Sequence, residues 1–348
     1  MEKILSISVA SYMVEDYIRD TLESCIIPEI MDDIEVLVIV DGVCDRTPEI
    51  AKEFESRYPD TFRVIIKENG GYGTAVNRGV TEARGKYFKC LDGDDSFNKE
   101  GLKDLVDFLK ETDADWIVSS YERLEEGDRS LREIVDPVAP SYKMRVNKID
   151  FYAARADFNV ECGVWLNTIR TQILKDHLPK LPGKCNFTDE LVNVCFLPYV
   201  KIFACTFKPV YKYLLRKRPV SDSSRMKLLQ NFIFIRKKQL ESFGRMTGEY
   251  VANYRNYKYR VRVYYQKLIW NILGMKPSAM MLKELKDIES YCRAKAPAIY
   301  KAMEDKEQLG KKAFIMSALR RSNYAYPIRL VAYRFMKNYI DRREHISG

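Results

Sequence analysis

Apolar strand segments and amphipathic helical segments alternate through the first hundred residues. In chain order, the expected elements are strand 4–10, helix 16–25, strand 34–40, helix 48–58, strand 63–67, helix 74–83 and strand 86–91. The segment 34–40 is apolar throughout, as expected for a strand that is covered on both faces. This alternation predicts an α/β fold with a parallel sheet, whose ligands lie at the carboxyl ends of the strands.

The two parts of the chain differ sharply in charge. Residues 1–210 carry 27 Lys+Arg and 38 Asp+Glu, whereas residues 211–348 carry 31 Lys+Arg and 11 Asp+Glu. A chain of 348 residues exceeds one typical domain, and past about residue 225 the pattern turns helical and basic. We therefore expect an α/β domain over residues 1–222 and a mainly helical C-terminal domain over residues 223–348.

Cysteine and histidine usage argues against a zinc cluster or a disulfide framework. The eight cysteines include no C-x-x-C pair, and there are only two histidines. The apolar start of the chain contains serines and is followed by Glu15 and Asp16, so we interpret it as a buried strand and not as a signal peptide. No stretch of transmembrane length lacks charges, so we expect a cytoplasmic protein with no segment spanning a bilayer.

Three carboxylates follow the strand 86–91 within four residues, at Asp92, Asp94 and Asp95. Such neighbours repel one another, and oxygen ligands of this kind suit Mg²⁺ or Mn²⁺ that also holds a substrate phosphate. A solvated acidic turn before the next helix is the alternative.

A glycine-rich turn at residues 69–73 separates a strand from a helix. It could hold a diphosphate at the helix N-terminus, or simply form a tight turn. As a dinucleotide fingerprint it fails, because Val76 stands where the third glycine is needed.

Together, four segments resemble the family 2 glycosyltransferases, inverting enzymes of the GT-A fold, a Rossmann-like nucleotide-diphospho-sugar transferase fold. The matching segments are residues 11–13, residues 40–47, the run Asn69, Gly71, Ala75, Asn77 and Gly79, and the pair Asp92 and Asp94. The departures are Val40, where the family has Asp, and Val43, where it has Ser. The resemblance implies transfer of a sugar from a nucleotide-diphosphate donor, a UDP-sugar, to a hydroxyl of a cell-surface glycan or lipid-linked precursor.

The same resemblance assigns the donor site. It implies donor contacts from Ser11, Tyr12, Asp41, Asn69, Gly71, Asn77 and Asp92. Asp41 would contact the uracil or ribose, and Asp94 would be the principal ligand of a divalent metal, Mn²⁺ or Mg²⁺, with Asp92 beside it. Asp95 would support the ribose or the metal ligands.

A carboxylate is also needed to take the proton from the acceptor hydroxyl. The resemblance places an acidic pair at Asp189 and Glu190, with Glu190 favoured by alignment and Asp189 open because the order of acids is reversed. The alternative is a helix start capped by Thr188 with acids in its first turn. A basic loop carrying Arg216, Arg218 and Ser221 resembles the family segment that closes over the diphosphate.

Tyrosine and basic residues interleave in the C-terminal part, at residues 254–267 and 324–334. This mixture suits the surface of an anionic membrane, RNA or a dimer interface. Because a lipid-linked acceptor requires a membrane, we expect peripheral attachment to the inner face of the cell membrane. A homodimer is the alternative, and no nucleic-acid partner is expected.

Two other functions fit part of the pattern. A sugar nucleotidyltransferase has a related fold but needs a glycine-rich, lysine-containing loop after its first strand, and residues 10–15 lack one. An inactive glycan- or membrane-binding scaffold is disfavoured by the intact Asp41, Asp92 and Asp94.

Overall fold

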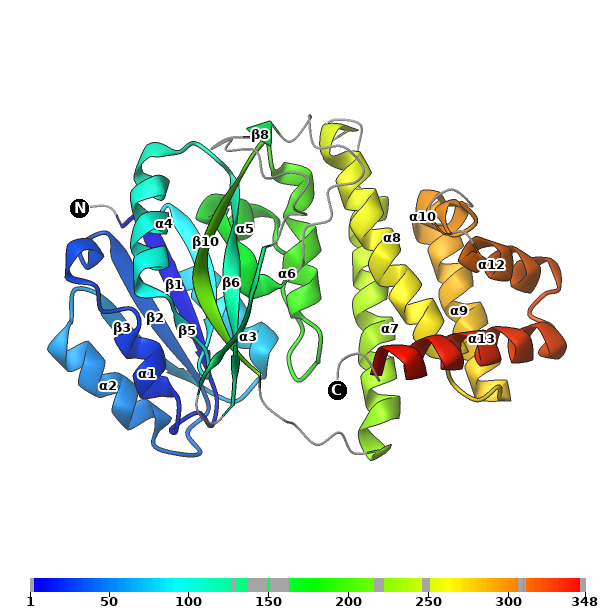
Figure 1. Cartoon of the computed structure of the whole chain (residues 1–348), viewed down its shortest axis with the longest axis horizontal. Helices are drawn as coiled ribbons and strands as arrows, with labels where there is room; N and C mark the ends of the chain where they lie inside the picture. The colour runs from blue at the N-terminus through cyan, green and yellow to red at the C-terminus, as the bar shows by residue number, and fades with distance from the viewer. Residues whose placement is uncertain are drawn as a thin grey trace. The chain divides into compact units, whose positions relative to one another are not determined.

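The computed structural model describes residues 3–126, 129–136, 149–150, 163–215, 222–245, 251–305, 309 and 311–344. The chain divides into two compact units, Met1–Val220 and Ser221–Gly348. Figure 1 shows the sheet in the first unit and a group of helices in the second.

The first unit is built on a mixed sheet with the strand order β3-β2-β1-β4-β9-β6-β10-β5 (Figure 1). The strands are β1 (Leu5–Ser11), β2 (Ile34–Asp41), β3 (Phe62–Lys67), β4 (Tyr87–Asp92), β5 (Ser96–Phe97), β6 (Trp116–Glu125), β9 (Asn167–Arg170) and β10 (Ile202–Leu215), with β7 (Leu131–Val135) beside β6 and β8 (Ile149–Asp150) beside β10. The first four strands are parallel, and β9 runs antiparallel to both of its neighbours. The predicted strand–helix alternation is therefore confirmed.

Helices connect these strands as the apolar periodicity requires. They are α1 (Ile18–Glu23), α2 (Thr47–Arg57), α3 (Tyr72–Glu82), α4 (Lys99–Glu111), α5 (Thr171–His177) and α6 (Asp189–Cys195). Right-handed crossovers put α1 and α2 on one face and α3 on the other, because the connection from β3 to β4 runs across the sheet in the opposite direction. The core strand β2 is buried along its whole length, as its apolar sequence predicts.

Thr47 does not serve as the N-cap of α2. Thr47 is the first helical residue, and its hydroxyl accepts a hydrogen bond from the Val14 amide at 3.1 Å. The carboxylate of Asp45 accepts the Thr47 amide at 3.1 Å. Asp45 therefore supplies the N-terminal acceptor, while Thr47 fastens the loop after β1 to α2.

The second unit consists of helices. They are α7 (Asp222–Gly244), α8 (Val251–Leu273), α9 (Ala279–Lys295), α10 (Pro297–Ala302), α12 (Lys311–Arg321) and α13 (Tyr326–Glu344). No described helix combines the length and apolar character needed to cross a membrane.

Many of the tyrosines expected to face a membrane are instead in the core of this unit. Tyr257 and Tyr265 are fully buried, and Tyr324 is 8% exposed. The Tyr324 hydroxyl donates to the buried Glu289 at 2.9 Å, and the Tyr265 hydroxyl also binds Glu289. Tyrosine supplies apolar area and one polar atom that finds a partner inside the helical unit, so these residues are not membrane anchors.

Candidate functional site

The predicted donor residues meet at the carboxyl edge of the parallel strands. Asp41 is the last residue of β2, Ser11 the last of β1 and Asp92 the last of β4. In the register of the sheet, Ser11 pairs with Val40, and Ala10 pairs with Asp92. One sheet edge thus carries the strand ends that the sequence singled out.

Asp41 organises the glycine-rich turn. Its carboxylate accepts hydrogen bonds from the amides of Gly70, at 2.9 Å, and Gly71, at 2.7 Å, and it also binds the Lys67 ammonium. Burial alone would raise the pKa of this carboxyl, but the Gly70, Lys67 and Gly71 contacts outweigh it and hold the pKa below its ordinary value. Asp41 is therefore a charged anchor of the turn, only 3% exposed.

The glycine-rich turn is also the docking surface for a segment more than a hundred residues away. The amide of Lys184 donates to the Gly70 carbonyl at 2.7 Å. Gly71 has φ +84°, and a Cβ atom at Gly73 would lie 2.6 Å from the Pro182 carbonyl oxygen. These two glycines are needed for the backbone conformation and for the close approach of the segment 181–188.

Asn77 clamps the same segment. Its side-chain amide donates to the Leu181 carbonyl at 2.9 Å, and its oxygen accepts the Leu181 amide at 3.0 Å. The structure thus gives Asn77 a backbone clamp, which the sequence pattern could not distinguish from a ligand contact, and its predicted donor contact stays a prediction.

The three carboxylates after β4 do not converge. Asp95 is buried and accepts hydrogen bonds from the Tyr211 hydroxyl, at 2.7 Å, and from the Leu214 amide, at 2.8 Å. Burial first, and then the charge of Asp92, raises the pKa of Asp95 well above its ordinary value. Asp95 thus joins the acidic turn to β10, and Asp92 and Asp94 remain the candidate metal ligands.

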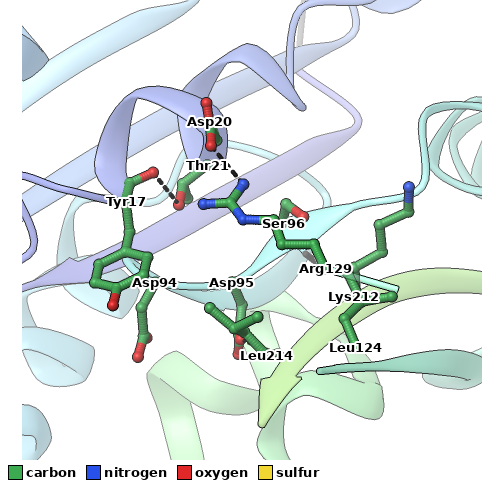
Figure 2. Close-up of a pocket in the computed structure, with 10 residues that line it drawn as sticks. All are labelled: Tyr17, Asp20, Thr21, Asp94, Asp95, Ser96, Leu124, Arg129, Lys212 and Leu214. Carbon is green, nitrogen blue, oxygen red and sulfur yellow. Dashed lines mark hydrogen bonds and ion pairs between the residues drawn. The ribbon is translucent and has the colours of Figure 1, made fainter. Parts of the chain in front are cut away.

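Asp94 lies at a small cavity (Figure 2). Tyr17, which precedes α1, and Thr21 of α1 line one side, and Lys212 and Leu214 of β10 line another. Asp95 lines the same cavity, and Figure 2 shows it next to Leu214, whose amide it accepts. Within the described residues there is no group of three or more His, Cys, Asp or Glu side chains arranged to hold a metal ion.

The remaining donor candidates differ in exposure. Ser11 is 1% exposed and its hydroxyl lies 3.5 Å from the Val9 carbonyl, so it is part of the interior. Tyr12 is 46% exposed, and Asn69 is also exposed. Tyr12 and Asn69 can therefore meet a ligand directly, while Ser11 cannot without rearrangement.

The acidic pair at the start of α6 separates into one accessible and one buried carboxylate. Asp189 is partly exposed, whereas Glu190 is 7% exposed and its Oε2 atom is enclosed by protein. The Thr188 side chain makes no capping hydrogen bond, so the alternative interpretation of this segment as a helix start capped by Thr188 is not supported.

Buried amides hold α6 in place. The Asn167 side chain of β9 donates to Asn193 of α6 at 2.8 Å and accepts the Trp116 indole N–H at 2.8 Å. Asn193 follows Asp189 by one helical turn, so this chain fixes the rotation of the helix that carries the acids.

Tyr72 is a site residue that the sequence interpretation missed. It begins α3. Burial, and then the neighbouring Asp92, Cys90 and Asp189, raise the pKa of its hydroxyl well above the ordinary value. The charges of both the acidic turn and the acidic pair of α6 therefore act on the Tyr72 hydroxyl. An aromatic residue between the glycines of a predicted ligand-binding turn is the signal that could have identified it.

Comparison with known proteins gives a family match for the first unit. The family model described as Glycosyl transferase family 2 matches residues 6–156. Residues 6–156 thus match this family. The match confirms the predicted resemblance, and it covers β1–β7, the glycine-rich turn and the Asp92–Asp94 turn.

Sequence relatives of this chain come from several bacteria. EpsH of Bacillus subtilis is 41% identical over 91 residues, which are 26% of this chain and 26% of EpsH. The minor teichoic acid biosynthesis protein GgaA of Bacillus subtilis is 33% identical over 110 residues, 30% of this chain and 25% of GgaA. Glycosyltransferase GlyG of Streptococcus pneumoniae is 30% identical over 129 residues, 37% of this chain and 42% of GlyG. The matched regions thus span less than half of each relative.

A solved structure matches nearly the whole chain. S. aureus TarS 1–349, crystallised in complex with UDP-GlcNAc, superposes with a TM-score of 0.68 at 18% identity, over 97% of this chain and 92% of that chain. This similarity extends through the helical unit and confirms the predicted fold class, a GT-A domain followed by a mainly helical region. Arg216, Arg218 and Ser221, expected at the diphosphate, lie outside the described residues.

Proposed function

We propose that this chain is an inverting glycosyltransferase that uses a nucleotide-diphosphate sugar. The observation that carries the proposal is that three acidic residues act on one glycine-rich turn. The Asp41 carboxylate accepts hydrogen bonds from two amides of the turn, and the charges of Asp92 and Asp189 raise the pKa of the Tyr72 hydroxyl within it. A UDP-sugar is the donor class that we favour, because the TarS structure of the same fold contains UDP-GlcNAc.

The residues after β4 fit a divalent metal. Mg²⁺ and Mn²⁺ are commonly held by one or two carboxylates together with substrate phosphates and water, so Asp94 and Asp92 suffice without a complete protein cage. One of the Asp92 oxygens is enclosed by protein, which leaves Asp94, at its cavity, as the principal ligand. When bound, such an ion neutralises charge that develops on the diphosphate.

Asp189 is the better candidate for the general base. Asp189 is partly exposed and its charge raises the pKa of the Tyr72 hydroxyl, whereas Glu190 is buried. In the proposed step, Asp189 takes the proton of the acceptor hydroxyl as that oxygen bonds to the anomeric carbon. The bond from this carbon to the diphosphate oxygen breaks on the opposite face, and its electron pair leaves with the nucleotide diphosphate.

The acceptor proposed here is an anionic cell-surface glycan or its lipid-linked precursor. The excess of 31 Lys+Arg over 11 Asp+Glu in residues 211–348 supports an anionic partner. Attachment to the inner face of the membrane would rest on this charge alone, since the described tyrosines of the helical unit are largely internal.

Calorimetry with UDP tests the donor site. We expect the wild-type protein to bind UDP more tightly when Mn²⁺ is present, and Asp94→Asn to lose that enhancement while keeping its thermal stability. Asp104→Asn, an exposed change on α4, is the matched control and should keep it. If UDP affinity were independent of Mn²⁺ in all three proteins, the proposal that a metal assists donor binding would be wrong. If the wild-type protein did not bind UDP at all, the proposal of a uridine-nucleotide donor would be wrong.

A further inference from the structure

The segment 181–188 holds two residues in a backbone conformation that favours glycine. Lys184 has φ +49° and Phe187 has φ +67°. A Cβ atom makes this left-handed region unfavourable, so residues other than glycine adopt it where the surrounding structure forces them to. Strain of this kind concentrates at ligand sites. The segment leads directly into α6, the helix that carries the proposed base.

Backbone contacts place Lys184 directly on the glycine-rich turn. Its amide donates a hydrogen bond to the Gly70 carbonyl at 2.7 Å. A Cβ atom at Gly71 would lie 3.1 Å from the Lys184 nitrogen and 3.3 Å from its Cα atom. The two hydrogen bonds between Asn77 and Leu181 hold the same segment three residues earlier. The Lys184 backbone therefore has a fixed position on this turn.

The Lys184 side chain is a cation that the protein does not use internally. It is exposed, and among the described residues it forms no ion pair. The other lysine at the turn, Lys67, binds Asp41 and donates to the Thr74 hydroxyl at 2.9 Å. Because residues 1–210 carry 38 Asp+Glu and only 27 Lys+Arg, a cation held at this edge of the sheet is suited to an anionic ligand.

The contacts of Gly70 indicate which part of a donor would meet this cation. The Gly70 amide donates to Asp41, the proposed nucleoside contact, and the Gly70 carbonyl accepts from Lys184. In a nucleoside diphosphate the phosphates follow the ribose directly. An ammonium on a flexible four-carbon stem beside the nucleoside contact therefore reaches the phosphates.

We infer that the Lys184 ammonium binds the diphosphate of the donor. The inference rests on the proposed function, to which it adds a phosphate contact from the loop before α6. A cation at this place neutralises negative charge on the departing nucleotide diphosphate. Glycine would relieve the backbone at this position, but it would remove the charge.

Lys184→Gly tests the contact, because glycine adopts the left-handed conformation freely and carries no ammonium. The measurement is the calorimetric affinity for uridine and for UDP, with Mn²⁺ present. We expect unchanged uridine affinity and about ten-fold weaker UDP binding, the effect of losing one hydrogen bond to a charged group. The melting temperature should stay the same or rise. Lys184→Gln, which keeps the backbone cost, should lose UDP affinity to the same extent.

Two controls separate the backbone from the charge. Asn323 has φ +48° in the exposed turn between α12 and α13, so Asn323→Gly relieves a similar backbone conformation far along the chain. It should leave the ratio of UDP to uridine affinity unchanged. Lys180 is exposed four residues before Lys184, and Lys180→Ala removes a nearby charge. Its UDP affinity should stay close to that of the wild type.

Four outcomes would contradict the inference. Equal UDP affinity in wild type and Lys184→Gly would show that the ammonium makes no phosphate contact. A parallel loss of uridine and UDP affinity would show that the change acts by displacing the glycine-rich turn. An equal loss in Lys180→Ala would replace the contact with a general effect of charge. A wild-type protein that binds uridine as tightly as UDP would leave no phosphate contact to assign. The proposed function itself fails separately, if the wild type binds neither uridine nor UDP.

Discussion

The side chain of Asn77 forms two hydrogen bonds with the backbone of Leu181, 104 residues further along the chain. This clamp holds the segment that leads directly into α6 and its acidic pair. The glycine-rich turn therefore has a structural task in addition to any contact with a donor. It sets the position of the proposed base relative to the strand ends that carry Asp41 and Asp92.

Asn77→Ala should impair catalysis more than donor binding. The change leaves the amide and carbonyl of Leu181 without their partners, which costs about 1–3 kcal/mol of stability for each buried group left unpaired. Because α6 would then be held less firmly, we expect kcat to fall at least ten-fold with a smaller change in the KM for the donor. Steady-state kinetics and thermal unfolding measure the two effects.

Arg78→Ala is the control for that change. Arg78 is on the exposed side of the same helix and pairs with Glu82 at 2.9 Å. Exposed pairs contribute little, so its kinetics and stability should stay close to those of the wild type. An equally large kinetic defect in Arg78→Ala would show that any disturbance of α3 has the same result.

Asp41→Asn should change how stability depends on pH. The pKa of Asp41 is below its ordinary value because the Gly70, Lys67 and Gly71 contacts outweigh burial, which would raise it. The carboxylate therefore stabilises the folded state above about pH 4, the pKa of an unfolded Asp, and this contribution is lost as pH falls through the folded pKa. The variant should be less stable than the wild type near pH 7, with the difference shrinking toward pH 2–3.

Chemical unfolding across this pH range measures the difference, and Asp107→Asn provides the comparison. Asp107 also has a lowered pKa, chiefly through its hydrogen bond from Lys103, but that pair is exposed. Its substitution should have a much smaller effect on stability at every pH. If the difference in unfolding free energy between wild type and Asp41→Asn did not vary with pH, the conclusion that Asp41 anchors the turn as a charged carboxylate would be contradicted.

Lys89→Met should stabilise the protein at neutral pH. Lys89 is fully buried in β4, where burial lowers its pKa to about 7, and its ammonium donates to the Trp165 carbonyl at 2.7 Å. The unfolded chain binds this proton more readily between pH 7 and 10.5, so the stability of the wild type rises with pH relative to the variant. The relative slope should reach about 1.4 kcal/mol per pH unit at most.

Unfolding free energies between pH 7 and pH 8.5 test this slope. Lys103→Met, an exposed change on α4, should leave the slope unchanged. If Lys89→Met destabilised the protein equally at all of these pH values, the contact with Trp165 would outweigh the cost of burying the ammonium.

The order of strands and helices could be predicted because local apolar patterns determine it. Strand β2 is apolar from end to end and is buried from end to end. The ends of these strands also carried the candidate acids, since carboxyl ends of parallel strands share one edge. That part of the site follows from sequence alone.

Contacts between distant segments could not be predicted in the same way. The pairing of Asn77 with Leu181 and of Asp95 with Tyr211 depends on tertiary packing. Both residues occur in motifs that also bind ligands, so the sequence assigned Asn77 to the donor and Asp95 to the support of the ribose or the metal ligands. The tyrosines of the helical unit show the same ambiguity, because an interleaved aromatic and basic pattern suits a buried helix core as well as a membrane surface.

The most direct test of the central claim is the rate of UDP release from a panel of UDP-sugars with Mn²⁺, where water replaces the acceptor. We expect slow hydrolysis of at least one donor by the wild type, and loss of this activity in Asp94→Asn. Asp189→Asn should lower the rate about 10²–10⁴-fold, the usual contribution of a general base. Glu190→Gln should retain more activity than Asp189→Asn. A wild-type protein that releases no UDP from any donor, or an Asp189→Asn variant as fast as the wild type, would contradict the account.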